Sequence, residues 1–236
     1  MRVYRQDFQI LSSDVDISRR LRLSTLFTRL QEAAIAHTID LGVTREKTLD
    51  KGLLWAVTQY RALFHRLPQY DEKVVLLTWP GRTMHLYFPR YFRLVDEKGS
   101  VLFEAVSLWV LIDKNTRGIV FPESYDIYIK ETTTGNELPM PGRIRRQNVE
   151  LVSSFTVPYS YVDLNGHMNN ARYYDLAVDS MPEEMRSRSL RELSSEHIGE
   201  AQLGDALSVG CSASDSSFYI CGEKEKPVFR MNFMFE

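Results

Sequence analysis

A short polar run in the second half of the chain carries the side chains best suited to chemistry. Asp163, Asn165 and His167 alternate there with Leu164 and Met168 around a glycine. In extended backbone alternate residues project to the same side, so we expect the three polar side chains to face together while the two apolar ones anchor the other side. A carboxylate, an amide and an imidazole together can orient water, accept a proton and stabilise a carbonyl oxygen that becomes negative.

Two asparagines follow this run and lead into a predicted helix at residues 171–181, which Pro182 ends. Asn169 or Asn170 would make a good N-cap, and the free N–H groups at a helix start favour negative charge. The same residue types also form ordinary polar loops, and for Asp163 or Asn170 taken alone that structural interpretation is the stronger one. The combination, rather than any single residue, indicates a functional site.

The elements before this run form one α+β unit. Apolar residues recur every three or four positions from residue 23 to residue 41, which predicts a helix with one buried face, with Ser24 as N-cap and Gly42 as its end. Stretches rich in aromatic and β-branched residues predict strands at 3–10, 53–67, 72–79, 85–95, 101–112 and 118–121. Turn sequences between the later strands favour an antiparallel sheet.

A turn-rich, partly basic stretch separates this unit from a second one with the same order of elements. The second unit has predicted strands at 155–161, 194–203, 206–213, 217–223 and 227–235, with the helix at 171–181 after the first of them. We therefore predict an N-terminal domain at residues 1–125, a linker at 126–150 and a C-terminal domain at 151–236.

The two units also align without gaps. Placing Asp16 opposite Asp163, an offset of 163 − 16 = 147, aligns Val15 with Val162 and brings the two predicted helices into register. A repeat of this length is too long for a solenoid unit, so it predicts two copies of one fold fused head to tail.

The alignment separates what the copies share from what they do not. Opposite Asn165 and His167 the first copy has Ser18 and Arg20. If the polar run is a site, only the second copy carries it. The first copy would then supply shape, surface or binding rather than catalysis.

The pattern Asp-x-Asn-x-His-x-x-Asn ahead of a helix, in the second of two fused units, resembles the acyl-acyl carrier protein (acyl-ACP) thioesterases. The resemblance extends over essentially the whole chain, through residues 54–57, 78–81, 107–113 and the pair Thr116-Arg117. It implies an α+β fold of two fused hot dog domains, in each of which an antiparallel sheet wraps around a central helix.

The same resemblance implies a catalytic set. Asp163, Asn165 and His167 match the family motif, and a glutamate that follows the helix is best matched by position by Glu200. From the residues alone, Glu196 or Glu200 would each be interpreted as a surface residue of a strand.

The residue after that glutamate narrows the chemistry. The plant enzymes of the family have a cysteine there, whereas this chain has Ala201, so a thiol nucleophile at this position is excluded. A mechanism based on water remains, with Asp163 or Glu200 as base or nucleophile and with Asn165 and His167 orienting the reacting groups. The spacing leaves the division of roles between the two carboxylates open.

The function implied is hydrolysis of fatty acyl-ACP to free fatty acid in fatty acid biosynthesis, with acyl carrier protein bearing acyl-phosphopantetheine as partner. Hydrolysis of acyl-coenzyme A is the alternative within enzymes. A non-catalytic acyl-thioester sensor is the alternative outside them, although the sequence has no helix-turn-helix or basic arm to serve as an output. A hot dog hydratase ranks low, because Gly166 stands where the hydratase pattern has proline.

Composition limits the remaining classes. A formal net charge of −2 argues against nucleic acid, and no apolar run is long enough for a membrane span or a signal peptide. Cys211 and Cys221 lack metal or redox spacing and are expected to be reduced thiols in a cytoplasmic protein. No nucleotide fingerprint or metal-ligand cluster is present, so we expect no cofactor and no metal. Further pairing into a homodimer stays open, as does the acyl chain length.

Three tryptophans, Trp55, Trp79 and Trp109, lie on predicted strands. They could line a tunnel for an acyl chain. Aromatic residues on strands are more often part of an ordinary core, and this is the stronger interpretation from sequence.

Overall fold

The chain folds into one antiparallel sheet, in which the two halves of the chain repeat the same strand order from the outer edge to the centre. The computed structural model describes residues 3–134 and 137–236; residues 1–2 of the expected first domain and 135–136 of the expected linker lie outside the described residues. The first half contains β1 (Tyr4–Gln9), α1 (Leu23–Asp40), β2 (Leu53–Phe64), β3 (Lys73–Pro80), β4 (Phe88–Asp96), β5 (Val101–Asp113) and β6 (Ile119–Val120). The second half contains β7 (Glu150–Thr156), α2 (Arg172–Ser180), α3 (Glu183–Arg186), β8 (Leu190–His197), β9 (Ala206–Ala213), β10 (Ser217–Glu223) and β11 (Pro227–Phe235).

The order across the sheet is β1-β3-β4-β5-β2-β8-β11-β10-β9-β7, with β6 paired to β5. From its outer edge inwards, the first half has the order β1-β3-β4-β5-β2, and the second half has the order β7-β9-β10-β11-β8. If the strands of each half are numbered along the chain without β6, both orders are first, third, fourth, fifth, second. The halves meet where β2 and β8 pair antiparallel, from Gln59 opposite Glu196 to Leu63 opposite Glu192. The repeated order confirms two fused copies of one α+β unit, and each copy has the sheet and helix of a hot dog domain.

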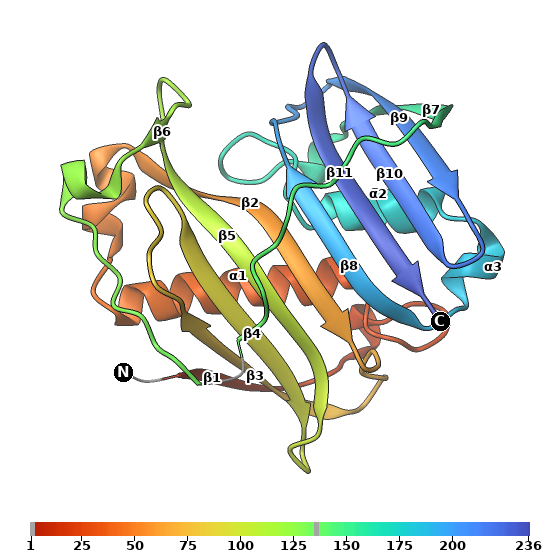
Figure 1. Ribbon diagram of the computed structural model, residues 1–236, viewed down its shortest axis with the longest axis horizontal. Coiled ribbons are helices and arrows are strands. Elements are labelled where there is room, and N and C mark those ends of the chain that lie inside the picture. The colour runs from red at the N-terminus through yellow and green to blue at the C-terminus, as the bar shows by residue number, and fades with distance from the viewer. Residues whose placement is uncertain (1–2, 135–136) are drawn as a thin grey trace.

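Both long helices lie on one face of this sheet, and the segment that joins the halves crosses the other face (Figure 1). The main core fills the space between the helices and the sheet, and it includes side chains from both halves. Among the described residues, no helix is long and apolar enough to cross a membrane.

The helix α1 follows its predicted apolar stripe. Its buried positions include Leu23, Leu26, Phe27 and Leu30, which recur at helical spacing. The predicted N-cap was wrong: Arg22 caps the helix without a side-chain bond, and Ser24 is a buried residue of the first turn. The predicted end was correct, because Asp40 is the last helical residue and the glycine at position 42 adopts the left-handed conformation that closes helices.

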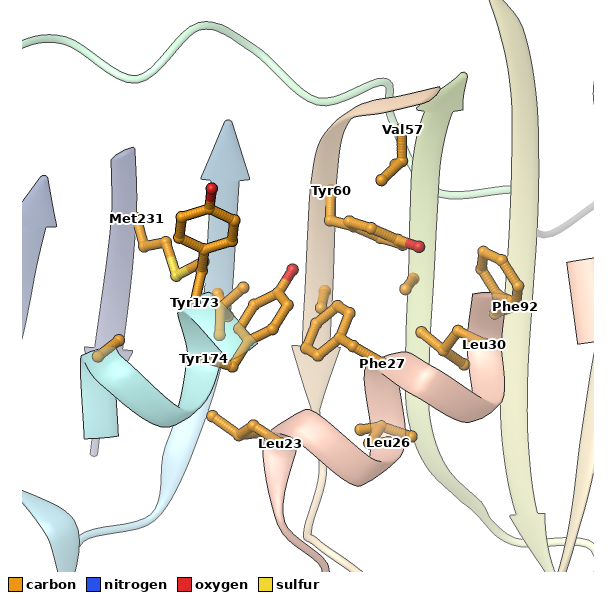
Figure 2. Close-up of a cluster of buried hydrophobic side chains, with 14 of the residues drawn as sticks. Leu23, Leu26, Phe27, Leu30, Val57, Tyr60, Phe92, Tyr173, Tyr174 and Met231 are labelled. Carbon is orange, nitrogen blue, oxygen red and sulfur yellow. The ribbon is translucent and has the colours of Figure 1, made fainter. Parts of the chain in front are cut away.

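A stacked aromatic pair joins the two helices and thereby the two halves. The rings of Phe27 from α1 and Tyr174 from α2 lie 3.9 Å apart at their centroids with an interplanar angle of 8° (Figure 2). The phenol of Tyr174 hydrogen-bonds Ser195 on β8 at 2.9 Å, which satisfies the buried hydroxyl. Tyr60 from β2 meets Phe27 edge-on at 5.0 Å. Aromatic packing at this seam therefore holds both halves on one core.

Two predicted strands of the second half are displaced in the structure. The strand expected at 155–161 ends at Thr156, because Pro158 has no N–H to donate to a ladder and a 3-10 turn at Tyr159–Tyr161 follows. The strand expected at 194–203 is β8, which ends at His197. Glu200 therefore lies in the loop after the strand and not on the sheet.

Apolar residues within a polar sequence hold in place the segment that joins the halves. Ile127 and Ile129 are buried in the main core. Ile144 forms a separate buried cluster with Tyr219 and Cys221, which point away from the helices. These contacts explain why a stretch of linker composition follows a defined path.

Candidate active site

The polar run folds as a tight turn and not as the extended segment expected from its alternation. Asp163 N–H donates to His167 O at 2.9 Å, and Gly166 N–H donates to Asp163 O at 3.0 Å. The Asp163 carboxylate closes the turn from inside, since its Oδ1 accepts the Asn165 N–H at 2.8 Å. Leu164 is 91% exposed, so its predicted anchoring role was wrong, whereas Met168 is buried as expected.

The first half contains the same turn at the aligned position. Asp16 N–H donates to Arg20 O at 2.8 Å, and Asp16 Oδ1 accepts the Ser18 N–H at 2.8 Å. Arg19 adopts a left-handed backbone with φ 61°, where Gly166 has φ 81° in the second half. Both copies use an aspartate to build the turn. The Oδ1 atom of Asp163 is therefore engaged in a structural hydrogen bond that the first copy also has. Chemistry specific to the second copy must involve the residues that differ.

His167 and Glu200 come together beside this turn. His167 Nε2 lies 3.1 Å from Glu200 Oε2, and the side-chain exposures are 14% and 40%. The imidazole is therefore largely covered while the carboxylate reaches solvent. This contact confirms that the motif and the loop after β8 meet at one place, which the sequence could indicate only through resemblance.

The loop after β8 is positioned by main-chain contacts. Met168 N–H donates to Ala201 O at 2.7 Å, which ties the turn to the residue after Glu200. Gly199 lies so close to the start of β11 that a Cβ at this position would stand 3.0 Å from the Pro227 carbonyl oxygen. A side chain at this position would require the loop or the segment at Pro227 to shift by a few tenths of an ångström, so glycine favours this close approach.

An arginine from the first half completes the cluster. Arg117 Nε donates to Glu200 Oε2 at 3.0 Å, a terminal nitrogen of the same guanidinium donates to Glu200 Oε1, and that nitrogen lies 3.4 Å from His167 Nδ1. Arg117 belongs to the turn after β5, in which Asp113 Oδ1 accepts the N–H groups of Asn115 and Thr116. These backbone hydrogen bonds lower the pKa of the Asp113 carboxyl. Sequence reasoning noted Thr116-Arg117 only as part of the family resemblance and did not place it at the site.

The other expected residues are placed differently. The side chain of Asn165 is exposed, and within residues 3–134 and 137–236 it makes no hydrogen bond to the His167–Glu200 pair. Glu196, the alternative glutamate, is buried on β8, where Gln59 donates to it at 3.0 Å. Glu196 is therefore a structural residue between the halves and not part of this cluster.

Tyr173 is a further polar residue at the site that sequence reasoning missed. Burial is the main reason that the pKa of its phenol lies far above the usual range. A backbone hydrogen bond at Ala201 opposes this rise, while the carboxylates of Glu200 and Asp163 are among those that add to it. The phenol therefore stays protonated at neutral pH.

His197, at the end of β8, is half-buried, and both of its ring nitrogens are shielded from solvent. Its ring packs edge-on against Tyr173 with centroids 5.6 Å apart, and within the described part of the chain neither ring nitrogen has a hydrogen-bond partner. Burial lowers the pKa of His197 from 6.5 to about 4. The ring is therefore uncharged at neutral pH.

The depressed pKa of His197 predicts a loss of stability in mild acid. As the pH falls from 6.5 towards 4, the unfolded chain binds a proton at this ring and the folded protein does not, so stability present above pH 6.5 is progressively lost. The interval of 6.5 − 4 = 2.5 pKa units sets an upper limit of roughly 3 kcal/mol. Urea unfolding of the wild type and of His197→Phe at pH 7 and pH 5 should show a smaller drop for the variant. An equal drop in both proteins, with His65→Phe as the exposed control, would contradict this assignment.

A narrow pocket in the first half opens beside α1. Trp55, Phe88 and Trp109 form its aromatic walls, and Ala34 from α1 contributes to the opposite side. Trp109 lies four residues before Asp113 on β5, a distance of about 13 Å along a strand. Trp79 packs with other residues on the outer face. Trp55 and Trp109 thus fit the interpretation as walls of a tunnel, whereas Trp79 fits the interpretation as an ordinary core residue.

One of the residues that line this pocket carries a charge. Arg90 is buried and donates to His37 Nδ1 at 3.1 Å and to Thr38 Oγ1 at 2.9 Å. Burial lowers the pKa of this guanidinium to about 10, so it remains charged at neutral pH. An apolar ligand is therefore stabilised by the aromatic walls but not by contact with Arg90.

Two antiparallel half-sheets, each packed on one central helix and joined edge to edge, define a protein of two fused hot dog domains. A family model described as the acyl-ACP thioesterase N-terminal domain matches residues 1–128, and one described as the acyl-ACP thioesterase C-terminal domain matches residues 144–230. The chain belongs to the acyl-ACP thioesterase family.

Solved structures and plant sequences agree with this assignment. An acyl-ACP thioesterase from Bacteroides thetaiotaomicron is 27% identical with a TM-score of 0.88, covering 99% of this chain and 98% of that one. The 12:0-ACP thioesterase of Umbellularia californica, at 20% identity and a TM-score of 0.82, shares the fold over 99% of this chain and 97% of its own. A chloroplastic palmitoyl-acyl carrier protein thioesterase from Gossypium hirsutum is 28% identical over 91% of this chain and 56% of its own length. The chain thus spans about half the length of the plant sequences it matches.

Proposed function

We propose that this protein hydrolyses the thioester of fatty acyl-ACP and releases free fatty acid. The observation that carries the proposal is the contact between His167 and Glu200, which brings an imidazole and a carboxylate together at the turn that matches the family motif. The aromatic pocket supports an acyl substrate, because apolar walls favour a hydrocarbon chain.

The geometry supports a mechanism based on water. Glu200 accepts a proton from a water molecule, and the resulting hydroxide attacks the thioester carbonyl carbon to form a tetrahedral intermediate. His167 orients the carboxylate. The intermediate then breaks its carbon–sulfur bond, and the proton held by Glu200 passes to the departing thiolate. Asp163 builds the turn in this scheme.

The acyl chain is assigned to the pocket between α1 and the sheet. The free volume of this pocket, about 20 Å³, is close to that of one water molecule, so Trp55, Phe88 and Trp109 must move apart to admit an acyl chain. Arg90, which also lines this pocket, is charged, so contact with it does not favour a hydrocarbon chain.

Matched substrates test the proposal. Thiol release from acyl-ACP and from acyl-coenzyme A, measured over the same acyl chains, should show kcat/KM at least about tenfold higher on the carrier protein, which corresponds to about 1.4 kcal/mol of transition-state stabilisation. A Glu200→Gln variant purified in parallel controls for contaminating thioesterases. Preference for coenzyme A would overturn the choice of carrier, and tight binding of acyl-ACP without turnover would favour a sensor.

The proposed compartment is the cytoplasm. Cys211 and Cys221 lie on neighbouring strands and form no disulfide with each other, a state that a reducing compartment maintains. Fractionation of cells that produce the native protein tests this, and recovery from a membrane or an organelle would contradict it.

A further inference from the structure

We propose that Arg117, supplied by the first half of the chain, is a positioning residue for the hydrolytic pair in the second half. Its guanidinium holds the Glu200 carboxylate in place and determines which ring nitrogen of His167 carries the proton. The inference rests on the proposed function. It assigns a specific task to the half whose own turn has Arg20 where the second has the imidazole.

The first part of this role follows from the shape of the contact. Arg117 donates to Glu200 through Nε and through a terminal nitrogen, so two parallel bonds fix the plane of the carboxylate. Glu200 stands on a loop with 40% of its side chain exposed. A glutamate without such a partner would sample several rotamers in solvent, and only some of them reach His167.

The second part concerns the imidazole. A guanidinium can only donate hydrogen bonds, so the terminal nitrogen of Arg117 at 3.4 Å makes His167 Nδ1 an acceptor. The ring proton then resides on Nε2, which lies 3.1 Å from Glu200 Oε2 and donates to it. One arginine thus orients both members of the pair.

The turn that carries Arg117 is built to aim this side chain. Arg117 has a left-handed backbone with φ 58°, which is uncommon for a residue with a side chain. Its N–H donates to Asp113 O at 2.9 Å, and β6 resumes pairing with β5 directly afterwards. The turn thus fixes the backbone from which the guanidinium reaches the second half.

The pair contributes little to folding. Arg117 is 31% exposed and Glu200 is 40% exposed, and ion pairs this accessible to water add little to stability. Arg61 and Glu192 form a matched pair, since an arginine of the first half also binds a glutamate of the second there, with Nε to Oε1 at 2.8 Å and exposures of 29% and 32%. That pair lies on β2 and β8, away from the turn.

Kinetics of Arg117→Ala test the proposal. With acyl-ACP as substrate, kcat should fall on the order of 10²-fold with KM little changed, because the lost contacts orient reacting groups and do not bind substrate. Guanidinium chloride, at concentrations well below those that unfold the protein, should restore part of the lost kcat. Arg117→Lys should be intermediate, because an ammonium keeps the charge and loses the fork.

Arg61→Ala is the control variant. It removes an arginine–glutamate pair between the halves of similar exposure, so it should retain wild-type kcat and show no response to guanidinium. Thermal unfolding should place both alanine variants close to the wild type. A kcat near the wild-type value in Arg117→Ala would overturn the proposal. It would also be overturned if the folded Arg117→Ala variant lost activity that guanidinium did not restore and that Arg117→Lys did not retain in part.

A spectroscopic readout separates this inference from the proposed function. In the ¹⁵N spectrum of the histidine ring nitrogens, His167 should be protonated at Nε2 in the wild type, lose that preference in Arg117→Ala and regain it with guanidinium. An unchanged His167 signal in Arg117→Ala would overturn the positioning role. Absence of turnover on every acyl thioester by the wild type, with the predicted ring signals present, would overturn the proposed function alone.

Discussion

His167→Ala is expected to lower kcat/KM on acyl-ACP by about 10²- to 10⁴-fold, the range typical for loss of a residue that assists proton transfer. His167 Nε2 lies 3.1 Å from Glu200 Oε2, and the alanine variant removes this contact from the carboxylate. Steady-state thiol release measures the loss, and thermal unfolding establishes that the variant is folded.

Arg20→Ala provides the internal control for that loss. Arg20 occupies the same position of the equivalent turn in the first half, and its guanidinium donates to Arg186 O at 2.6 Å. Removal of this side chain should leave kcat near the wild-type value. Comparable losses in the two variants would contradict the assignment of chemistry to the second turn alone.

The same assay separates the two carboxylates. Asn at position 163 retains an oxygen that can accept the Asn165 N–H, so Asp163→Asn preserves the turn. Glu200→Gln removes the proton acceptor and leaves the shape. We expect the larger loss in Glu200→Gln, and the reverse order would transfer the role of base to Asp163.

Phe27→Ala is expected to destabilise the protein by about 3–5 kcal/mol, the range for removing a buried aromatic ring from a core. Phe27 is 3% exposed and stacks on Tyr174 of the other half (Figure 2). The loss therefore opens a cavity at the seam between the two helices. Unfolding in urea, followed by circular dichroism, measures it.

Ile39→Ala on the same helix is the matched control. Ile39 is 47% exposed, and exposed substitutions usually change stability by less than about 0.5 kcal/mol. A cost below about 1 kcal/mol for Phe27→Ala, close to that of the control, would show that the stacked pair does not hold the halves together.

The fold was predictable because its signals are local or repeated. The apolar stripe of α1 lies within a single helix, and the offset of 147 residues aligned two turns that the structure shows to have the same hydrogen bonds. The bridge between Val15 and Leu21 recurs between Val162 and Met168 at that same offset. Such internal agreement requires no knowledge of how distant parts of the chain pack.

The site was less predictable because its decisive contacts are not local. Alternation suggested an extended run, but the Asp163 carboxylate bonds its own backbone two residues on and bends the chain into a turn. Glu200 leaves the expected strand because β8 ends at His197. Arg117 and Glu200 are separated by 83 residues and lie in different halves, so no spacing rule connects them.

The equivalent turns have a consequence for stoichiometry. A symmetric pair of identical hot dog subunits would present the turn twice, with the same residues each time. In the fused chain the first turn holds Arg20 against Arg186, and only the second turn meets a glutamate and an imidazole. Under the proposed function, each polypeptide therefore has one reaction centre, to which the first copy contributes Arg117 from within the same chain.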